Sequence, residues 1–278
     1  MSRHGGDYKQ GPERAHRVSA ARRFKATVEY DGTEFFGFQA QSDARTVQGE
    51  LEAALARLSG GIRQPVMGAG RTDAGVHATG QVIAFTYPGR LSAEALMEAL
   101  NGMLPPDVAI SGVRRAPAGF NPRYAARYRE YRYTIWNGPR SPLRERTSLW
   151  VRSELDVTAM VEAATAFEGR HDFSPFGGAD PQPVRTVHRL RVRRQGSTVT
   201  IDVRADAFLR GMVRRIVATL LTVGMGQLEA SAVPELLEAG RPALAGAAAP
   251  ARGLCLRQVA LGRRTGRTDS EVDTGHED

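Results

Sequence analysis

Residues 70–85 read GRTDAGVHATGQVIAF. They place one carboxylate, Asp73, in a turn bracketed by Gly70 and Gly75, directly before an apolar run that predicts a strand over residues 81–87. A carboxylate held on a tight loop against a strand can serve as a nucleophile or a base. The alternative is an aspartate that only hydrogen-bonds its own turn, as most loop aspartates do.

The segments on either side of this stretch predict one α/β half of the chain. Residues 24–30 alternate apolar and polar side chains, which is typical of a strand. Thr46 and Ser92 can each cap a helix with an apolar face. Further strands are predicted near residues 65–69 and over residues 108–113. The resulting order is βαββαβ, the ferredoxin-like arrangement.

The second half repeats this pattern without clear sequence identity to the first. Asp156 can cap a helix that runs to Phe167, and Gln195-Gly196-Ser197 can close a hairpin. The other expected elements are strands over 130–136, 186–194, 198–203 and 254–261, the longest helix over 208–223 and a short helix over 234–239.

We therefore expect a mixed α/β (α+β) fold of two ferredoxin-like halves with mainly antiparallel sheets, which face each other across a basic active-site cleft. The polar, proline-bearing stretch around residues 117–122 predicts the boundary between an N-terminal domain with the catalytic loop (23–117) and a C-terminal domain (118–262). The expected remainder is a disordered basic arm over residues 1–22 and a disordered tail over residues 263–278.

Charge and composition indicate a globular protein with a polyanionic partner. The chain has 278 residues, a net charge of +8 and a pI of about 10.2. Residues 114–146 hold nine arginines against two acids, and residues 185–215 hold nine against two. Two such stretches predict two walls of one basic groove, and arginine suits forked contacts to phosphate.

A single cysteine, Cys255, excludes an intrachain disulfide and fits a reducing compartment. No apolar run approaches the 18 residues of a membrane span, and the polar start lacks a secretory h-region. These features predict a cytoplasmic location.

The nine residues GRTDAGVHA at 70–78 closely resemble the signature of the tRNA pseudouridine synthase A (TruA) family, in which the aspartate is catalytic. Shorter matches extend the resemblance from about residue 24 to residue 261: YDGT at 30–33, GFQ at 37–39, TVQ at 46–48 and RTV at 185–187. The resemblance implies a homodimeric isomerase (an intramolecular transferase) that converts uridines 38, 39 and 40 of the tRNA anticodon stem-loop to pseudouridine. It implies no cofactor and no metal ion. Phe38 stands where relatives usually have tryptophan.

Pseudouridine formation breaks the N1–C1′ bond of uridine, turns the uracil and rejoins it through C5. The reaction needs a carboxylate that reaches C1′, C2′ or C6 of an extruded nucleotide, and the resemblance gives this role to Asp73. Whether Asp73 attacks C1′ or C6, or removes a proton, stays open. By its place in the motif, Arg71 is expected to contact a phosphate or base of the flipped nucleotide, the alternative being a surface arginine.

The run RYREYRY at 127–133 predicts a strand with Arg129, Tyr131 and Tyr133 on one face. An aromatic ring beside guanidinium groups is a common way to hold an unstacked base, whereas most tyrosine-rich strands are half-buried core. In the family the first tyrosine of Tyr-Arg-Tyr contacts the target base. That role carries to Tyr131, and Tyr133 is expected in the core.

The stretch ADAFLRGMVRRI at 205–216 resembles the family's helix that carries Met-Val-Arg. The arginine of that motif pairs with the catalytic aspartate, a role that carries to Arg214. Arg210 is expected one turn earlier on the same stripe, in the first helical turn, as a second contact to RNA. The chain departs from the family pattern at two points. Arg210-Gly211 stands where relatives often have histidine or asparagine, and Asp206 stands where many have asparagine.

His77 ends the signature. It could join Asp73 in a metal site, but no further ligand cluster has suitable spacing nearby. We expect instead a structural histidine or a contact to the RNA backbone, and no metal. Three rival functions follow: a pseudouridine synthase with another RNA target, a non-catalytic RNA-binding module, and a metal-dependent nuclease.

Overall fold

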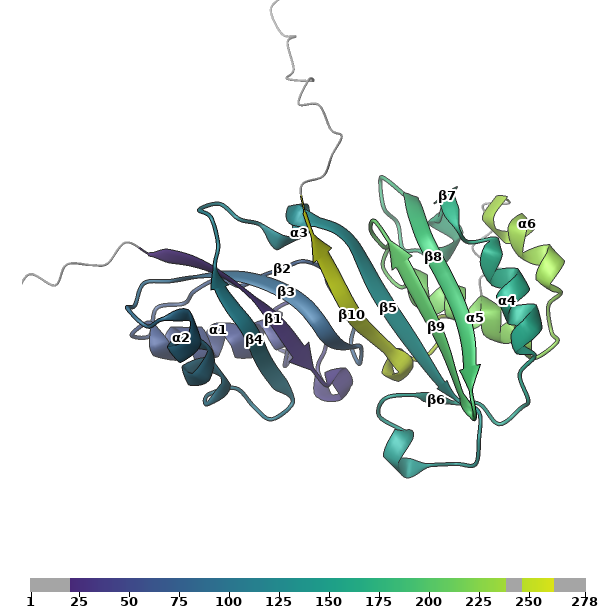
Figure 1. Ribbon diagram of the computed structural model, residues 1–278, viewed down its shortest axis with the longest axis horizontal. Helices are drawn as coiled ribbons and strands as arrows, with labels where there is room; N and C mark the ends of the chain where they lie inside the picture. The colour runs from purple at the N-terminus through teal and green to yellow at the C-terminus, as the bar shows by residue number, and fades with distance from the viewer. Residues whose placement is uncertain (1–20, 239–246, 263–278) are drawn as a thin grey trace, which may run out of the picture.

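The computed structural model describes residues 21–238 and 247–262 (Figure 1). The expected tail over residues 263–278 lies outside these ranges, as do residues 1–20 of the expected arm. Arg22, the last residue of the expected arm, falls within them and opens the first strand.

Within the described ranges, ten strands form a single sheet in the order β4-β1-β3-β10-β5-β9-β8-β7, with β2 on β3 and β6 on β5. All neighbours are antiparallel except β10 with β3 and β5 with β6. The strands are β1 (Arg22–Tyr30), β2 (Met67–Gly68), β3 (His77–Tyr87), β4 (Val108–Arg115), β5 (Ala126–Trp136), β6 (Leu149–Trp150), β7 (Gly169–Asp172), β8 (Val184–Gln195), β9 (Thr198–Ala205) and β10 (Leu254–Leu261).

The last strand joins the two halves of the chain. β10 pairs antiparallel with β5 and parallel with β3, with Cys255 opposite His77 and Leu256 opposite Ala78. The α/β class and the mainly antiparallel pairing are confirmed. The two halves nevertheless share one sheet and do not carry two that face each other, because β10 supplies backbone hydrogen bonds to both.

The helices are α1 (Val47–Leu58), α2 (Ala93–Asn101), α3 (Pro122–Ala125), α4 (Val157–Thr165), α5 (Met212–Gly224) and α6 (Val233–Glu238). In Figure 1, α1 and α2 lie beside the strands of the first half, and α4, α5 and α6 beside β7, β8 and β9. The predicted caps are confirmed: the side chains of Thr46, Ser92 and Asp156 each accept a hydrogen bond from a backbone N–H in the first turn of their helix.

Helix α5 begins four residues later than its apolar pattern predicts. Gly211, at its N-terminus, takes a left-handed conformation with φ of +72°, and a Cβ there would lie 2.8 Å from Nη1 of Arg215. That backbone is one a glycine adopts without strain, and it interrupts the helical path. Arg210 therefore precedes the helix, and the expectation that it sits in the first turn is wrong; Arg214 occupies that turn.

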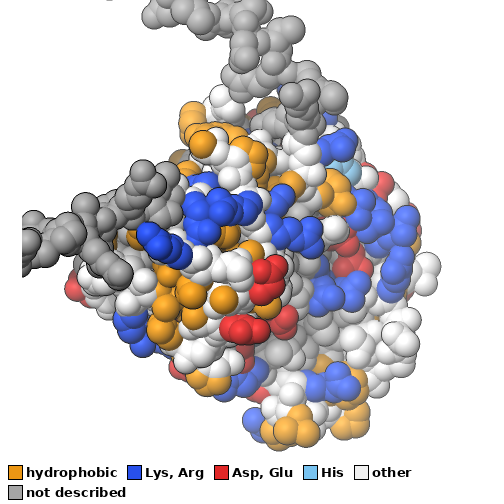
Figure 2. Space-filling view, turned by 60° about the vertical axis from the view of Figure 1, so that its left-hand side comes forward, with side chains coloured by type: hydrophobic (Ala, Val, Ile, Leu, Met, Phe, Trp, Pro, Cys, Tyr) orange, Lys and Arg blue, Asp and Glu red, His pale blue; other side chains and the backbone are white. Residues whose placement is uncertain are grey.

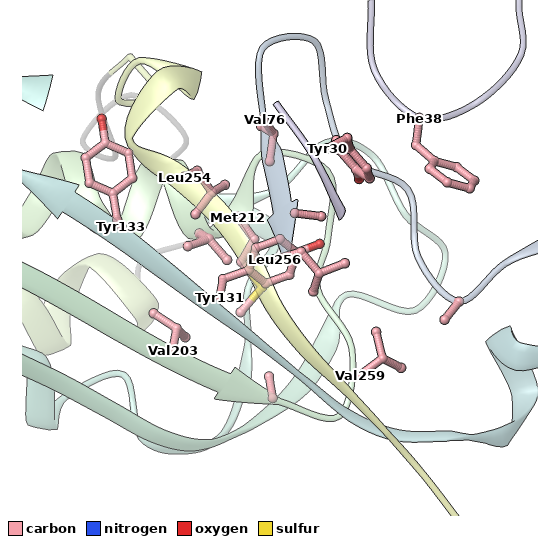
Figure 3. Packing of buried hydrophobic residues seen from close by; sticks show 14 of the residues in the cluster. Tyr30, Phe38, Val76, Tyr131, Tyr133, Val203, Met212, Leu254, Leu256 and Val259 are labelled. Atoms are coloured by element: carbon pink, nitrogen blue, oxygen red, sulfur yellow. The ribbon is translucent and has the colours of Figure 1, made fainter. Parts of the chain in front are cut away.

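A continuous core runs beneath both halves. Figure 3 shows Tyr131 close to Leu254, Leu256 and Met212, while Tyr30 comes from the first half. Buried residues alternate along β1, β5 and β9, so one face of each strand packs inward.

The opposite face of β5 and β9 carries charge. There Glu130 contacts Arg204 at 2.6 Å and Arg132 contacts Asp202 at 2.7 Å. This confirms the alternation expected for residues 127–133. Tyr133 is fully buried on the inner face, as expected for a core residue. None of the helices in the described ranges is long and apolar enough to cross a membrane.

Candidate active site

A cavity of about 1000 Å³ lies between the two halves and is lined by both. Five of the six predicted site residues line it, and His77 does not; those lining it are Arg71, Asp73, Tyr131, Arg210 and Arg214. Figure 2 shows several clusters of arginine and lysine side chains on one face of the molecule, with hydrophobic and acidic side chains between them.

Each of the two arginine-rich stretches reaches this cavity, but only in part. Arg123 and Arg129 line it from the first stretch, and Arg185, Arg210 and Arg214 from the second. The arginines paired with Glu130 (Arg189 and Arg204) and with Asp202 (Arg132) lie on the opposite face of the sheet. Fewer arginines therefore line the cavity than the counts for the two stretches indicate.

The residues that precede Asp73 are held by side chains from neighbouring strands. Gln81, fully buried on β3, donates from Nε2 to the carbonyl of Gly70 at 2.9 Å. Arg129 on β5 donates to the carbonyl of Ala69 from Nε at 3.1 Å and from Nη2 at 2.5 Å. These contacts fix the entry to the loop at the edge of the cavity.

Thr72 anchors the loop from below. Its hydroxyl contacts the hydroxyl of Tyr30 at 2.8 Å, and both side chains are buried. Its carbonyl accepts a hydrogen bond from the N–H of Phe38 at 3.1 Å. Gly37 has φ of +96°, and a Cβ there would lie 2.7 Å from this carbonyl, so a glycine is needed for the close approach of the two segments.

Asp73 faces the cavity, and among the described residues it forms an ion pair with Arg214. Its Oδ2 lies 3.5 Å from Nη1 of Arg214, and the two side chains are 33% and 23% exposed. The Nε of Arg214 donates to the carbonyl of Ala249 at 2.6 Å, and the N–H of Ala249 donates to the carbonyl of Arg214 at 3.0 Å. The guanidinium is thus held in place independently of the carboxylate. An anion beside this first-turn arginine also offsets the unfavourable placement of a cation at a helix N-terminus.

Tyr131 forms part of the cavity wall. Its ring meets Phe208 edge-on at 5.2 Å between centroids, and 7% of the residue is exposed. Burial raises the pKa of the Tyr131 hydroxyl, so the group stays neutral in the physiological range. It can therefore offer a ring and a neutral hydroxyl to a nucleotide in the cavity.

Arg71 and Arg210 are both exposed at the cavity, on opposite walls. Within residues 21–238 and 247–262 neither guanidinium makes a hydrogen bond or an ion pair. Guanidinium groups in this state are available for phosphate oxygens, which they bind in a forked geometry.

His77 is placed in the structure by protein groups on both sides of its ring. Nδ1 accepts a hydrogen bond from the N–H of Gly32 at 3.0 Å, which leaves Nε2 to donate to the carbonyl of Arg252 at 3.1 Å. The residue is buried and begins β3. Both nitrogens are occupied, so the ring joins the first half of the chain to the segment before β10.

Two departures from the usual motif have structural explanations. Oδ1 of Asp206 accepts hydrogen bonds from the N–H groups of Thr186 and Ala207, at 3.1 Å and 2.7 Å, so it shapes the end of β9. An asparagine oxygen could accept the same bonds. Gly211 supplies the left-handed residue before α5, a conformation that asparagine also tolerates.

No group of three or more histidine, cysteine or acidic side chains within the described ranges could hold a metal ion. Asp73 therefore has no ligand partners there, and its neighbour at 3.5 Å is a cation, which would repel a metal.

Sequence reasoning missed how Arg129 acts. Besides Ala69 it donates to the carbonyls of Asp206 at 2.9 Å and Arg123 at 3.2 Å, so one guanidinium ties three segments of the cavity wall together. The partners of Arg129 are backbone carbonyls, which every residue carries, so the sequence does not show which of them the guanidinium contacts.

Comparison with known proteins gives a consistent result. A family model described as tRNA pseudouridine synthase matches residues 26–125 and 163–260. A tRNA pseudouridine synthase A from Myxococcus xanthus is 44% identical over 264 residues, which cover 91% of this chain and 99% of the relative. Those from Geotalea uraniireducens (strain Rf4) and Thermotoga neapolitana are 44% and 43% identical, each over 86% of this chain and 99% of the relative.

Proposed function

The chain belongs to the tRNA pseudouridine synthase family, and from this membership we propose that it converts uridines 38, 39 and 40 of the tRNA anticodon stem-loop to pseudouridine, with Asp73 as the nucleophile. Membership makes the protein an isomerase that acts on tRNA. The positions modified and the role of Asp73 are the parts proposed here.

One observation carries the assignment of Asp73. Among the predicted site residues it is the one carboxylate, and it faces a cavity of about 1000 Å³ beside a guanidinium that other contacts hold in place. Because the hydrogen bonds of Gly70 and Thr72 fix the loop, the carboxylate can meet a carbon of the nucleotide without first reorganising.

The reaction balances without a further reactant. The N1–C1′ bond breaks while Asp73 forms a covalent bond, either to C1′ of the ribose or to C6 of the uracil. The uracil turns, the C5–C1′ bond forms, the carboxylate leaves, and C5 loses its proton to solvent while N1 gains one. The proton released from C5 is the atom to follow in an assay.

The other cavity residues support binding and orientation. Tyr131 offers its ring and neutral hydroxyl to the uracil, and Arg71 and Arg210 offer guanidinium groups to the phosphates. Extruding a paired nucleotide costs a few kcal/mol, which contacts of this kind offset. The contacts of both ring nitrogens with protein groups support a structural role for His77.

The partner and location follow from the same proposal. One cavity of about 1000 Å³ is small beside an L-shaped tRNA, which supports a homodimer whose second subunit contacts the rest of the RNA. A cytoplasmic location is supported by the tRNA substrate and by Cys255, whose thiol has a pKa raised by burial and is thus poorly reactive. Light scattering with and without tRNA measures the oligomeric state.

Mapping the product tests the positions. Unmodified tRNAs with a uridine at only one of positions 38, 39 or 40 are incubated with the protein, and pseudouridine is located by carbodiimide labelling and primer extension. Stops at all three positions are expected. Product confined to another arm of the tRNA would identify a synthase with a different target and would remove the anticodon arm from the proposal.

A further inference from the structure

Eight large hydrophobic side chains are prominently exposed in the described ranges, and two of them are aromatic. Phe36 is 65% exposed and Tyr124 is 72% exposed. Both line the cavity that contains Asp73, and so does Met67, at 38% exposed. Water-facing aromatic rings are unfavourable for the free protein, so their gathering at one cavity indicates a ligand that covers them.

The backbone around Phe36 is bound to the catalytic loop on both sides. The carbonyl of Phe35 accepts a hydrogen bond from the N–H of Gly75 at 3.1 Å, and the N–H of Phe38 donates to the carbonyl of Thr72 at 3.1 Å. The N–H and carbonyl of Phe36 itself contact Arg45 and Gln41. The exposed ring is therefore carried at a fixed place beside Asp73.

Tyr124 is held at another part of the cavity wall. It lies in α3, whose first turn is capped by Asn121 and whose preceding carbonyl, at Arg123, accepts a hydrogen bond from Arg129 at 3.2 Å. The next carbonyl, at Ala125, accepts from the N–H of Gly262 at 3.0 Å. This ring also projects from rigid backbone, with the exposed Arg123 next to it.

We propose that Phe36 and Tyr124 form stacking platforms for unpaired nucleobases that flank the target uridine in the anticodon arm. The proposal rests on the proposed function. Flat apolar rings beside free guanidinium groups, here Arg71 and Arg210, match an RNA strand whose bases are splayed out and whose phosphates need cations. A peptide or lipid ligand would make less use of aromatic rings combined with guanidinium groups that bind phosphate in a forked geometry.

Stacking also explains how one cavity can serve neighbouring positions. A phenylalanine ring has no hydrogen-bonding group, so it accepts any base by its flat face and reads no sequence. A site that read base edges next to the target would restrict the enzyme to one sequence context. Two platforms in one cavity let the strand shift by one nucleotide and still be supported.

The test combines changes in the protein with changes in the RNA. Phe36→Ala, Tyr124→Ala and Phe36→Tyr are compared with wild type and with Leu143→Ala, which truncates a side chain that is 97% exposed and outside the cavity. The substrates are an anticodon stem-loop RNA with one 5-³H-uridine and the same RNAs with an abasic site at each nucleotide flanking it. Affinity is measured by filter binding and turnover by tritium release.

For intact RNA each alanine variant is expected to bind about tenfold more weakly, while Phe36→Tyr and Leu143→Ala bind as wild type does. When the base that stacks on one of the two rings is removed, the wild type should lose about the same tenfold in affinity. The alanine variant of that ring should bind this abasic RNA no more weakly than it binds intact RNA. An equal loss on intact RNA and on every abasic RNA would overturn the stacking proposal. Unchanged affinity of both alanine variants would overturn it as well.

The readouts separate this proposal from the proposed function. If the wild type binds the stem-loop with the expected dependence on flanking bases but releases no tritium from any RNA, the platforms stand and the catalytic assignment fails. If tritium is released and the alanine variants bind and turn over normally, the assignment stands and the platforms fail. Thermal melting of each variant checks the fold, and no large shift is expected because both rings are exposed.

Discussion

The hydrogen bond between Tyr30 and Thr72 gives a quantitative test of how the catalytic loop is held. The two hydroxyls are 2.8 Å apart, and the residues are 3% and 7% exposed. Tyr30→Phe removes one partner and leaves the threonine hydroxyl buried without its bond. A lost hydrogen bond contributes about 1 kcal/mol, and an unpaired buried group costs about 1–3 kcal/mol. We therefore expect the free energy of unfolding to fall by about 1–3 kcal/mol.

The kinetic consequence follows because Thr72 directly precedes Asp73. A carboxylate displaced by about 1 Å can lose up to about a hundredfold in rate, so kcat should fall by at least about tenfold with KM nearly unchanged.

The matched control is Thr72→Val, alone and with Tyr30→Phe. The double variant should be no less stable than the worse single variant, because neither hydroxyl is then left unpaired. Urea unfolding measures the stabilities, and tritium release measures the rates. Additive losses of stability in the double variant, or wild-type kcat in Tyr30→Phe, would refute the idea that this buried pair fixes the loop.

Three further outcomes are expected. Arg214→Met should lower kcat by at least about tenfold, and it should lower stability by about 1–3 kcal/mol because it removes the hydrogen bond from Nε to the carbonyl of Ala249 as well as the partly exposed pair with Asp73. Arg214→Lys should restore part of the rate, and full activity of Arg214→Met in steady-state assays would show that the pair is incidental. Tyr131→Phe should keep most of the activity and Tyr131→Leu should not, and equal kinetics of the two would argue against a role for the ring. Burial raises the pKa of the hydroxyls of Tyr30, Tyr131 and Tyr133 above the ordinary tyrosine value of about 10. Their contribution to stability is therefore full below a pH of about 10 and is lost as the pH rises beyond that value. Stability measured by urea unfolding should fall steeply above that pH, and a flat profile would contradict this expectation.

Local features of the fold were predictable because their causes are local. Thr46, Ser92 and Asp156 cap helices through bonds to backbone groups three residues away, which a sequence displays directly. The hairpin around Gly196, which has φ of +57°, is likewise predictable from its turn residues.

Long-range features were not predictable in the same way. The pattern of β10 shows a strand but not which strands it joins, so the sharing of one sheet by the two halves came only from the structure. The start of α5 was misplaced because the apolar spacing continues through Gly211, where the backbone turns left-handed.

In the candidate site, too, some features were predictable from the sequence and others were not. Asp73, Arg214 and Tyr131 were identified through motif resemblance, and the structure brings all three to one cavity. Arg129 makes its contacts to backbone carbonyls, which leave no trace in sequence. His77 belongs to the motif but supports the fold, since its ring bridges Gly32 and the segment before β10.

The central claim is that Asp73 performs the chemistry of a pseudouridine synthase. Its most direct test is tritium release from 5-³H-uridine-labelled tRNA by wild type and Asp73→Asn, with tRNA affinity measured in parallel. Asn fits the same space and leaves the contacts of Gly70 and Thr72 in place, so we expect binding close to that of wild type and no release above background. Substantial release by Asp73→Asn would remove this carboxylate from the mechanism.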